Sequence, residues 1–235
     1  MEVRAFTEGD RPGLRELFGR AGQGAPGAGL WGHHASEAAV YLDPYLGPEP
    51  AVLLLAVDEG RPVGYLAGCL DSAAFPGEDE RIGRAVREHR LYLRAGPARF
   101  FARALTDLAW AAARRQPTAK EFTDPRWPAH LHLNVAPEAR GTGAADLLMD
   151  RWLERAADRG VPGCHLRTLS ENTRAVRFFR RKGFVPHGLT PVVPGLRHAG
   201  RRPHQLTHGV EPRRVTGRPP RPEARLPPLL GRIVR

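Results

Sequence analysis

The sequence predicts an α/β domain, with a central sheet of six or seven strands flanked by helices. Strand-like runs and runs of helical period alternate along most of the 235 residues. Residues 51–57 and 62–70 are apolar runs on either side of a polar turn at residues 58–61, a pattern typical of a β-hairpin. A glycine-containing junction at residues 141–143 connects another strand-like run to an amphipathic helix.

The N-terminal part is expected to supply three strands and two helices. Residues 2–6 form the first strand, and the first arm of the hairpin is apolar on both faces, as in an inner strand. A helix follows the first strand and ends at about Gly19, and a shorter helix begins at Ser36. Between them, residues 21–32 are rich in Gly and Ala and are predicted to form a flexible loop.

Residues 73–128 depart from the sheet pattern. Two runs of helical spacing, residues 80–93 and 97–115, predict a helical insertion between the third and fourth strands. These helices either only cover the sheet or form one wall of an acceptor pocket, and the sequence leaves both alternatives open.

The C-terminal part continues the alternation and ends in a tail. Residues 1–210 are interpreted as one domain. Residues 211–235 are rich in Pro and Arg and are predicted to be disordered. The remaining expected strands are residues 130–135, 163–169, a segment from Phe184 onward and residues 204–210, and the expected helices are residues 143–159 and 172–182.

Composition limits the classes of partner. The net charge is +11, but the tail contributes +5 of it, and all basic residues except two lysines are arginine, so we expect no dedicated nucleic-acid site. No apolar run approaches the roughly 20 residues that cross a membrane, and the N-terminus lacks the apolar stretch of a signal peptide. A cytoplasmic protein without a membrane partner is therefore expected. Cys69 and Cys164 lie in apolar runs without metal-site spacing, which predicts buried free thiols and no metal.

The junction at residues 134–145 is the most informative part of the sequence. Glycines there let backbone N–H groups converge without Cβ crowding, and the helix N-terminus adds partial positive charge. Together they predict an anion cradle suited to a pyrophosphate. The dinucleotide-binding pattern with three glycines does not fit, and a P-loop is excluded because no Gly-Lys-Ser/Thr follows.

Two motifs resemble those of the GNAT superfamily of N-acetyltransferases. Residues 140–145 match its Q/R-x-x-G-x-G/A signature, after a Val-x-Pro-Glu lead-in at residues 135–138. Residues 172–184 resemble its N-x-x-A-x-x-F-Y-x-x-x-G-F element. The order and spacing agree with the family, and the resemblance is tight over residues 131–184.

This resemblance implies the GNAT fold, with a mixed and mostly antiparallel sheet, and acetyl-CoA as co-substrate. The backbone of Leu133, Asn134 and Val135 would run beside the pantetheine arm. Asn172 would contact the cofactor near its pantetheine or thioester end, which is compatible with a second role as a helix N-cap. The residues implied to hold the pyrophosphate, mainly through backbone N–H groups, are Arg140, Gly141, Thr142, Gly143, Ala144 and Ala145.

The implied chemistry is direct attack of an amine on the thioester, which needs a base, an N–H donor for the oxyanion and often an acid. The backbone N–H of Val135 is the expected oxyanion donor. Phe179 stands beside the cofactor where the family has a tyrosine, and it cannot give a proton. Water or another side chain protonates the thiolate, or the thiolate leaves as an anion, or the protein binds acyl-CoA without efficient catalysis.

The base is expected on the strand at residues 130–135, where alternation places His130, His132 and Asn134 on one face. An imidazole with an unperturbed pKa near 6.5 suits the deprotonation of an amine. His132 is the first choice, with a structural histidine as the alternative. The weaker candidates near the acceptor site are His165, the adjacent pair His33 and His34, which should point apart, and Asp71, expected to be a solvated carboxylate.

Three functions therefore remain in competition. The first is an enzyme that acetylates a small-molecule or peptide amine, for which a homodimer is an option because family members are often dimers. The second is a non-catalytic acyl-CoA-binding or sensor protein, prompted by Phe179. The third is a nucleic-acid-associated protein, prompted by the tail.

Overall fold

A single seven-stranded sheet organises the computed structural model, which describes residues 1–27 and 30–211. The sheet order is β1-β2-β3-β4-β5-β7-β6, and every neighbouring pair is antiparallel except β4 and β5. The expected α/β class and mostly antiparallel sheet are confirmed. The strands are β1 (Glu2–Ala5), β2 (Ala51–Asp58), β3 (Arg61–Cys69), β4 (Ala129–Val135), β5 (Cys164–Leu169), β6 (Val185–His187) and β7 (Gln205–Val210).

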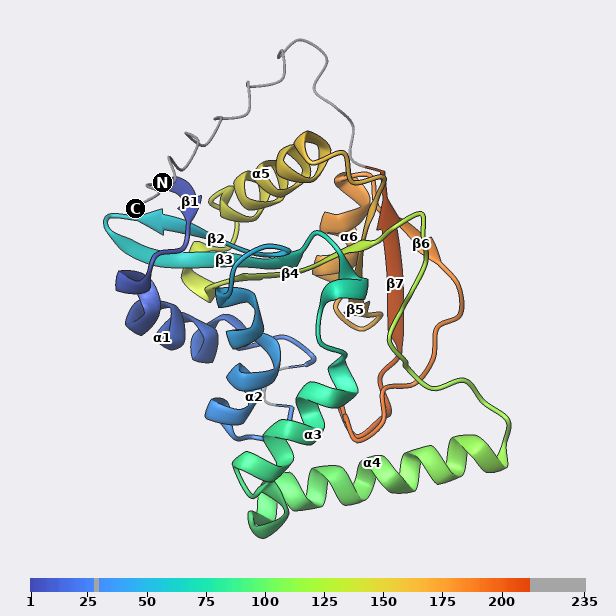
Figure 1. Cartoon of the computed structure of the whole chain (residues 1–235). Helices are drawn as coiled ribbons and strands as arrows, with labels where there is room; N and C mark the ends of the chain where they lie inside the picture. Colours follow the sequence, from blue (N-terminus) through green and yellow to red (C-terminus); the bar gives the residue numbers. More distant parts are fainter. Residues whose placement is uncertain (28–29, 212–235) are drawn as a thin grey trace, which may run out of the picture.

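Helices cover both faces of the sheet. The helices are α1 (Arg11–Ala21), α2 (His34–Tyr41), α3 (Glu78–Glu88), α4 (Ala95–Ala113), α5 (Ala144–Asp158) and α6 (Thr173–Arg181). Figure 1 shows α5 and α6 over one face, and α1 and α2 over the other. The core follows from the alternation of β2, since Leu54 packs toward α5 whereas Leu53 and Leu55 pack toward α1 and α2. Each such buried leucine stabilises the fold by roughly 1.5–3 kcal/mol.

Several helix boundaries differ from the sequence prediction. The helix predicted over residues 80–93 spans Glu78–Glu88 and is followed by a separate 3-10 turn, Leu91–Leu93, because Arg90 adopts a left-handed φ of 49° that interrupts the helix. The helix predicted over residues 97–115 lies two residues earlier, at Ala95–Ala113.

Helix α1 continues to Ala21 rather than ending at about Gly19. Helix α2 begins at His34 rather than at Ser36, because His33 acts as its N-cap. The Ser36 backbone N–H donates to Nδ1 of His33 at 3.3 Å, and the Ser36 hydroxyl donates to the His33 carbonyl at 2.9 Å. A histidine cap is outside the usual Ser/Thr/Asp/Asn set, so the pattern did not indicate it.

The parallel pair β4 and β5 is the irregular point of the sheet. Its register contains two residue pairs, Ala129 with Cys164 and His130 with His165. Beyond these pairs the two strands no longer pair, although β4 continues to Val135 and remains paired with β3 along its other edge. The sheet is therefore open between the second halves of β4 and β5.

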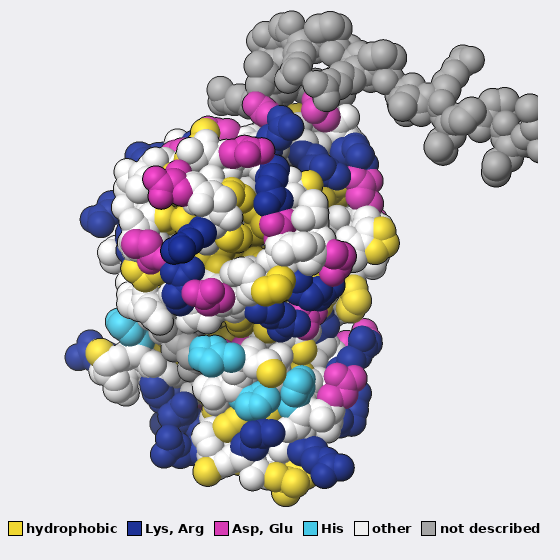
Figure 2. Space-filling model, turned by 90° about the vertical axis from the view of Figure 1, so that its left-hand side faces the viewer, with side chains coloured by type: hydrophobic (Ala, Val, Ile, Leu, Met, Phe, Trp, Pro, Cys, Tyr) yellow, Lys and Arg dark blue, Asp and Glu magenta, His cyan; other side chains and the backbone are white. Residues whose placement is uncertain are grey.

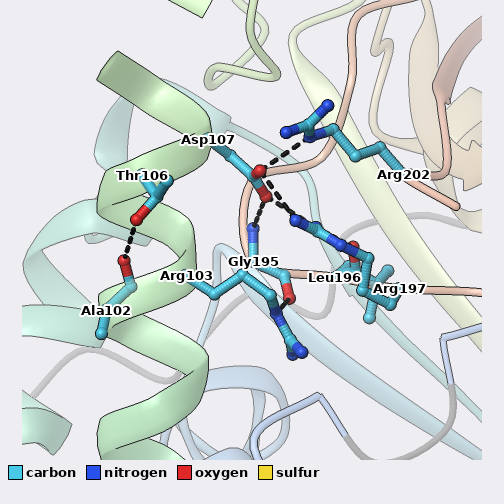
Figure 3. Close-up of polar contacts among 8 residues, drawn as sticks. All are labelled: Ala102, Arg103, Thr106, Asp107, Gly195, Leu196, Arg197 and Arg202. Atoms are coloured by element: carbon cyan, nitrogen blue, oxygen red, sulfur yellow. Dashed lines mark hydrogen bonds and ion pairs between the residues drawn. The ribbon is translucent and has the colours of Figure 1, made fainter. Parts of the chain in front are cut away.

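The expected helices between β3 and β4 are present as α3 and α4. Helix α3 packs against α2, whereas α4 lies farther from the sheet (Figure 1). Asp107 of α4 is 1% exposed and holds the loop between β6 and β7 (Figure 3). Its carboxylate accepts from the Gly195 N–H at 2.9 Å, from Arg197 at 2.6 and 2.8 Å and from Arg202 at 2.7 Å. Burial alone would raise the pKa of Asp107, but these donors hold it well below its usual range.

The surface mixes the two signs of charge. On the face shown in Figure 2, Lys and Arg side chains are interspersed with Asp and Glu side chains. Both cysteines are buried and free, as expected. Among the helices of residues 1–27 and 30–211, none combines the length and the apolar character that crossing a bilayer requires. The tail predicted at residues 211–235 lies outside the described residues, apart from Glu211.

Candidate active site

A cavity of about 640 Å³ opens where β4 and β5 separate. Its wall comes from β4, β5, the end of α1 with the loop after it, α2 and the first turns of α6. The described residues that border it are Phe18, Gly19, Gly22, Gln23, Ala25, Gly27, Leu30, His34, Glu37, Tyr41, Tyr65, Leu131, His132, Leu133, Asn134, Leu166, Arg167, Thr168, Leu169, Asn172, Ala175 and Phe179. Five of the predicted site residues are in this wall: His132, Leu133, Asn134, Asn172 and Phe179.

The open edge of β4 presents backbone groups to this cavity. The Ala136 N–H donates to the Val63 carbonyl of β3 at 2.9 Å. Successive N–H groups of a strand point to opposite sides, so the N–H groups of Val135 and Leu133 face away from β3, toward the gap. The Val135 side chain packs against the core under α5, so only its backbone is available there.

The predicted cradle lies at the N-terminus of α5. Gly141 and Gly143 have φ of 85° and 91°, the left-handed region that favours glycine, and a Cβ at either position would meet open space. The first N–H groups of a helix have no partner within it, so those of Ala144 and Ala145 are free for a ligand. The site thus offers several N–H donors and the positive end of the α5 dipole to an anion.

Arg140 connects the cradle to the cavity. Its guanidinium donates to the carbonyls of Ala21 at 3.3 Å and Gln23 at 2.6 Å, and Gln23 borders the cavity. Burial and the nearby Arg174 lower the pKa of Arg140. The positive charges of the two guanidinium groups repel each other, and free N–H groups lie beside them. An anion bound there would reduce this repulsion. Arg140 therefore contributes its side chain to this site.

The backbone N–H groups of Arg140 and Thr142 have partners of their own. That of Arg140 donates to the Pro137 carbonyl at 3.3 Å, and that of Thr142 donates to the Ala139 carbonyl at 3.4 Å. The backbone contacts predicted for these two residues are therefore not offered by free N–H groups.

His132 occupies the position predicted for the base. It borders the cavity, and its ring lies 6.1 Å from that of His130, on the same face of β4. Burial, with a further contribution from Arg167, lowers the pKa of His132 to about 4. The imidazole is therefore neutral at pH 7 and has a free lone pair. Among the described residues its ring nitrogens have no hydrogen-bond partner, unlike those of the other two histidines nearby.

Those two histidines have structural roles. His130 bonds the Tyr45 hydroxyl at 2.9 Å and the Ser72 hydroxyl at 2.7 Å. Nδ1 of His165 donates to the Trp127 carbonyl at 2.8 Å. Burial lowers the pKa of both imidazoles. The alternative of a satisfied structural histidine therefore applies to His130 and His165, but not to His132.

The remaining weaker candidates separate as follows. His33 caps α2 while His34 borders the cavity, so the two point apart as expected. Asp71 is exposed, and its carboxylate accepts from the Ala73 N–H at 3.0 Å, which makes it a local cap. Within the part of the chain that the structure describes, no three His, Cys, Asp or Glu side chains are grouped so that they could hold a metal ion.

Asn172 and Phe179 mark the α6 side of the cavity. The Asn172 side chain accepts from the Ala175 N–H at 3.3 Å, so it caps α6 and borders the cavity at once. Phe179 is 7% exposed, and its ring lies 5.4 Å from that of Phe178 and 5.8 Å from that of Phe184. A phenyl ring at this point has no proton to give.

A second group of polar side chains was not singled out from the sequence. Arg167 of β5 forms an ion pair with Glu78, the first residue of α3, and the Tyr41 hydroxyl donates to the same carboxylate at 3.0 Å. Arg167 and Tyr41 border the cavity together with Glu37 of α2. Of the two helices between β3 and β4, α3 thus reaches the site through Glu78, whereas no residue of α4 borders the cavity.

Comparison with known proteins identifies a family for this chain. Residues 14–184 match the model of the acetyltransferase (GNAT) family, which spans the sheet from β2 to β5, the cradle and α6.

Solved structures share the fold at low identity. A ribosomal-protein-alanine N-acetyltransferase from Brucella melitensis is 18% identical, with 90% of this chain and 99% of that chain covered and a TM-score of 0.54. YncA from Salmonella typhimurium, solved with its cofactor acetyl-CoA, is 15% identical, with 90% and 93% covered and a TM-score of 0.54. An agmatine N-acetyltransferase in its apo form is 19% identical, with 89% and 98% covered and a TM-score of 0.56.

Proposed function

Because the chain belongs to the acetyltransferase (GNAT) family, we propose that it transfers an acetyl group from acetyl-CoA to a primary amine by direct attack. The observation that carries the proposal is the opening between β4 and β5, where a free strand edge and a neutral imidazole border one cavity. Acetyl-CoA supplies the thioester carbon at which the amine reacts.

The residues of the chain fit this co-substrate. The free N–H groups of residues 143–145 and the open space above Gly141 and Gly143 suit a pyrophosphate. The edge of β4 from Leu133 to Val135 suits the amide groups of a pantetheine arm, which would add to the strand like a further strand. The Val135 N–H, which faces the gap, would stabilise the negative charge that develops on the carbonyl oxygen.

His132 would accept the proton that the amine loses. A base with a pKa near 4 is weaker than one poised near the operating pH. We therefore place the proton transfer after the new N–C bond has begun to form, when the nitrogen is most acidic. Glu78, close to His132 and Arg167, favours the protonated imidazole that results, because its charge opposes the lowering of the His132 pKa.

Phe179 favours a second candidate function, a protein that binds acyl-CoA without turnover. Under the enzyme proposal the thiolate leaves as an anion or takes its proton from water, because Phe179 cannot supply one. The acceptor is proposed to be a small-molecule or peptide amine.

Release of free CoA thiol, measured with acetyl-CoA and a panel of amines, tests the proposal. Turnover that disappears in His132→Gln while acetyl-CoA still binds supports the enzyme. Tight acetyl-CoA binding without turnover on small amines, peptide N-termini and lysine side chains would favour the non-catalytic candidate.

A further inference from the structure

Glu37 is a buried carboxylate in the wall of the cavity. It lies in the first turn of α2, its residue is 5% exposed, and it borders the same space as His132. The mechanism proposed above gives it no role.

The hydrogen bonds of Glu37 require an oxygen but no charge. Oε1 accepts from the backbone N–H of Trp31 at 2.9 Å and of Gly32 at 2.8 Å, which fixes the end of the loop after α1. The other oxygen, Oε2, has Nδ1 of His34 at 4.0 Å. Glutamine would provide the same acceptor to both N–H groups. The loop therefore accounts for Oε1, and the N-terminus of α2 favours a negative charge at this position. Oε2 is left with the distant Nδ1 of His34.

The wall of the cavity, as far as the structure describes it, gives Glu37 no arginine or lysine partner. Among the described residues that border the cavity, Arg167 is the one arginine and there is no lysine. Arg167 forms its ion pair with Glu78. Within residues 1–27 and 30–211, the ion-pair contact of Glu37 is with Nδ1 of His34 at 4.0 Å, and no Lys or Arg lies within that distance. A positively charged ligand group in the cavity would give Oε2 a charged partner, and hydrogen bonds between charged groups are stronger than neutral ones.

We infer that Glu37 binds a cationic group of the acceptor, so that the acceptor is a primary amine carrying a second positive charge, an ammonium or a guanidinium. This inference rests on the proposed function. One end of the acceptor is acetylated beside His132, and the other end pairs with Oε2 of Glu37. Glu37 thus determines acceptor specificity without taking part in the proton transfer.

Matched pairs of acceptors test the inference in the wild-type protein. For chain lengths of three to six carbons, kcat/KM is measured for the α,ω-diamine, the monoamine and the amino alcohol. Because hydrogen bonds to charged groups are the stronger class, we expect the diamine to exceed its monoamine by about tenfold or more at the best length.

The variant Glu37→Gln separates charge from structure. It should lower kcat/KM for the diamine until the preference over the monoamine is lost, and leave the affinity for acetyl-CoA unchanged. Glu88→Gln removes the same charge from an exposed position on α3 and should keep the preference.

The outcomes are distinct. Absence of turnover with every amine, in the presence of acetyl-CoA binding, contradicts the proposed function itself. Turnover with equal kcat/KM for diamine and monoamine at every length, or a preference that persists in Glu37→Gln, overturns the role of Glu37. If Glu37→Gln does not fold, the wild-type series decides, since a cation site requires a higher kcat/KM for the diamine than for the amino alcohol and the monoamine.

Discussion

The two parts of the proposed site are built from different kinds of atoms. The proposed cofactor part, residues 140–145 with the N-terminus of α5, offers the free backbone N–H groups of residues 143–145, which form one contiguous segment. The acceptor part uses the side chains of Glu37, Tyr41, His132 and Arg167, which come from α2, β4 and β5. The position and partial charge of backbone groups at a helix terminus depend little on the surrounding side chains. The charge state of an ionisable side chain depends on its burial and on the other charges nearby. The cofactor part should therefore tolerate most substitutions except at its glycines, and the acceptor part should be coupled and sensitive to pH.

The largest effect is expected at the acceptor part, from His132→Gln. Loss of a general base typically reduces kcat by about 10²–10⁴-fold, and the affinity for acetyl-CoA should not change. Steady-state kinetics and calorimetric titration measure the two quantities. His198→Gln, on the exposed loop between β6 and β7, is the control. A His132→Gln enzyme with unchanged kcat would assign the proton transfer to another group.

The cofactor part is tested with Gly143→Glu. A carboxylate at the cradle repels a pyrophosphate, and the left-handed φ is strained for any side chain, so the affinity for acetyl-CoA should fall by about 100-fold or more. Gly160→Glu is matched in conformation, with φ of 67° and open space, but lies past the other end of α5. Equal affinity of the two variants would place the pyrophosphate elsewhere.

Glu78→Gln tests whether the acceptor part is coupled. It leaves Arg167 charged and without its partner, so the free energy of unfolding should fall by about 2 kcal/mol, less than for a fully buried pair because both side chains are about one-fifth exposed. It should also lower the pKa of His132 further, since Glu78 opposes the lowering. Urea unfolding and NMR titration of the imidazole measure both. Glu80→Gln, from an exposed pair on the same helix, should change stability by less than about 0.5 kcal/mol.

The smallest effect is a loss of stability in mild acid. The pKa of His132 is lowered in the fold, so the unfolded chain takes up protons first as the pH falls. Above the unfolded pKa of about 6.5 the imidazole is neutral in both states and the free energy of unfolding is not reduced. Below that pH, protonation of the unfolded chain reduces the free energy of unfolding progressively, down to about pH 4. At pH 5 this amounts to roughly 1–2 kcal/mol from this residue. Urea midpoints between pH 7.5 and 5 should fall less steeply in His132→Gln than in the wild type. A parallel decline in both proteins would assign the acid sensitivity to other groups.

Sequence reasoning succeeded where the signal is local. The left-handed φ of Gly141 and Gly143 and the face of β4 that carries His132 depend on neighbouring residues, and both could be predicted from the sequence. The binding of an anion by residues 140–145 stays a prediction. Glu37 and Glu78 lie in helical stretches where an acidic residue near the N-terminus is ordinary. Their pairing with the loop after α1 and with Arg167 spans up to 89 residues and appears only in the fold. The lowered pKa of His132 likewise arises from burial, which the pattern does not contain.

The segment carrying α3 and α4 leaves and rejoins the sheet at a single place. The Ser72 N–H donates to the Pro128 carbonyl at 2.8 Å, and Cys69 of β3 is paired with His130 of β4. An excursion whose ends are one hydrogen bond apart can be lengthened, shortened or exchanged without moving a strand. It enters the site through Glu78 and is anchored at the far side by Asp107. The proposed acceptor part thus includes a segment that meets the sheet at one place, whereas the proposed cofactor part lies at the junction of the sheet and α5.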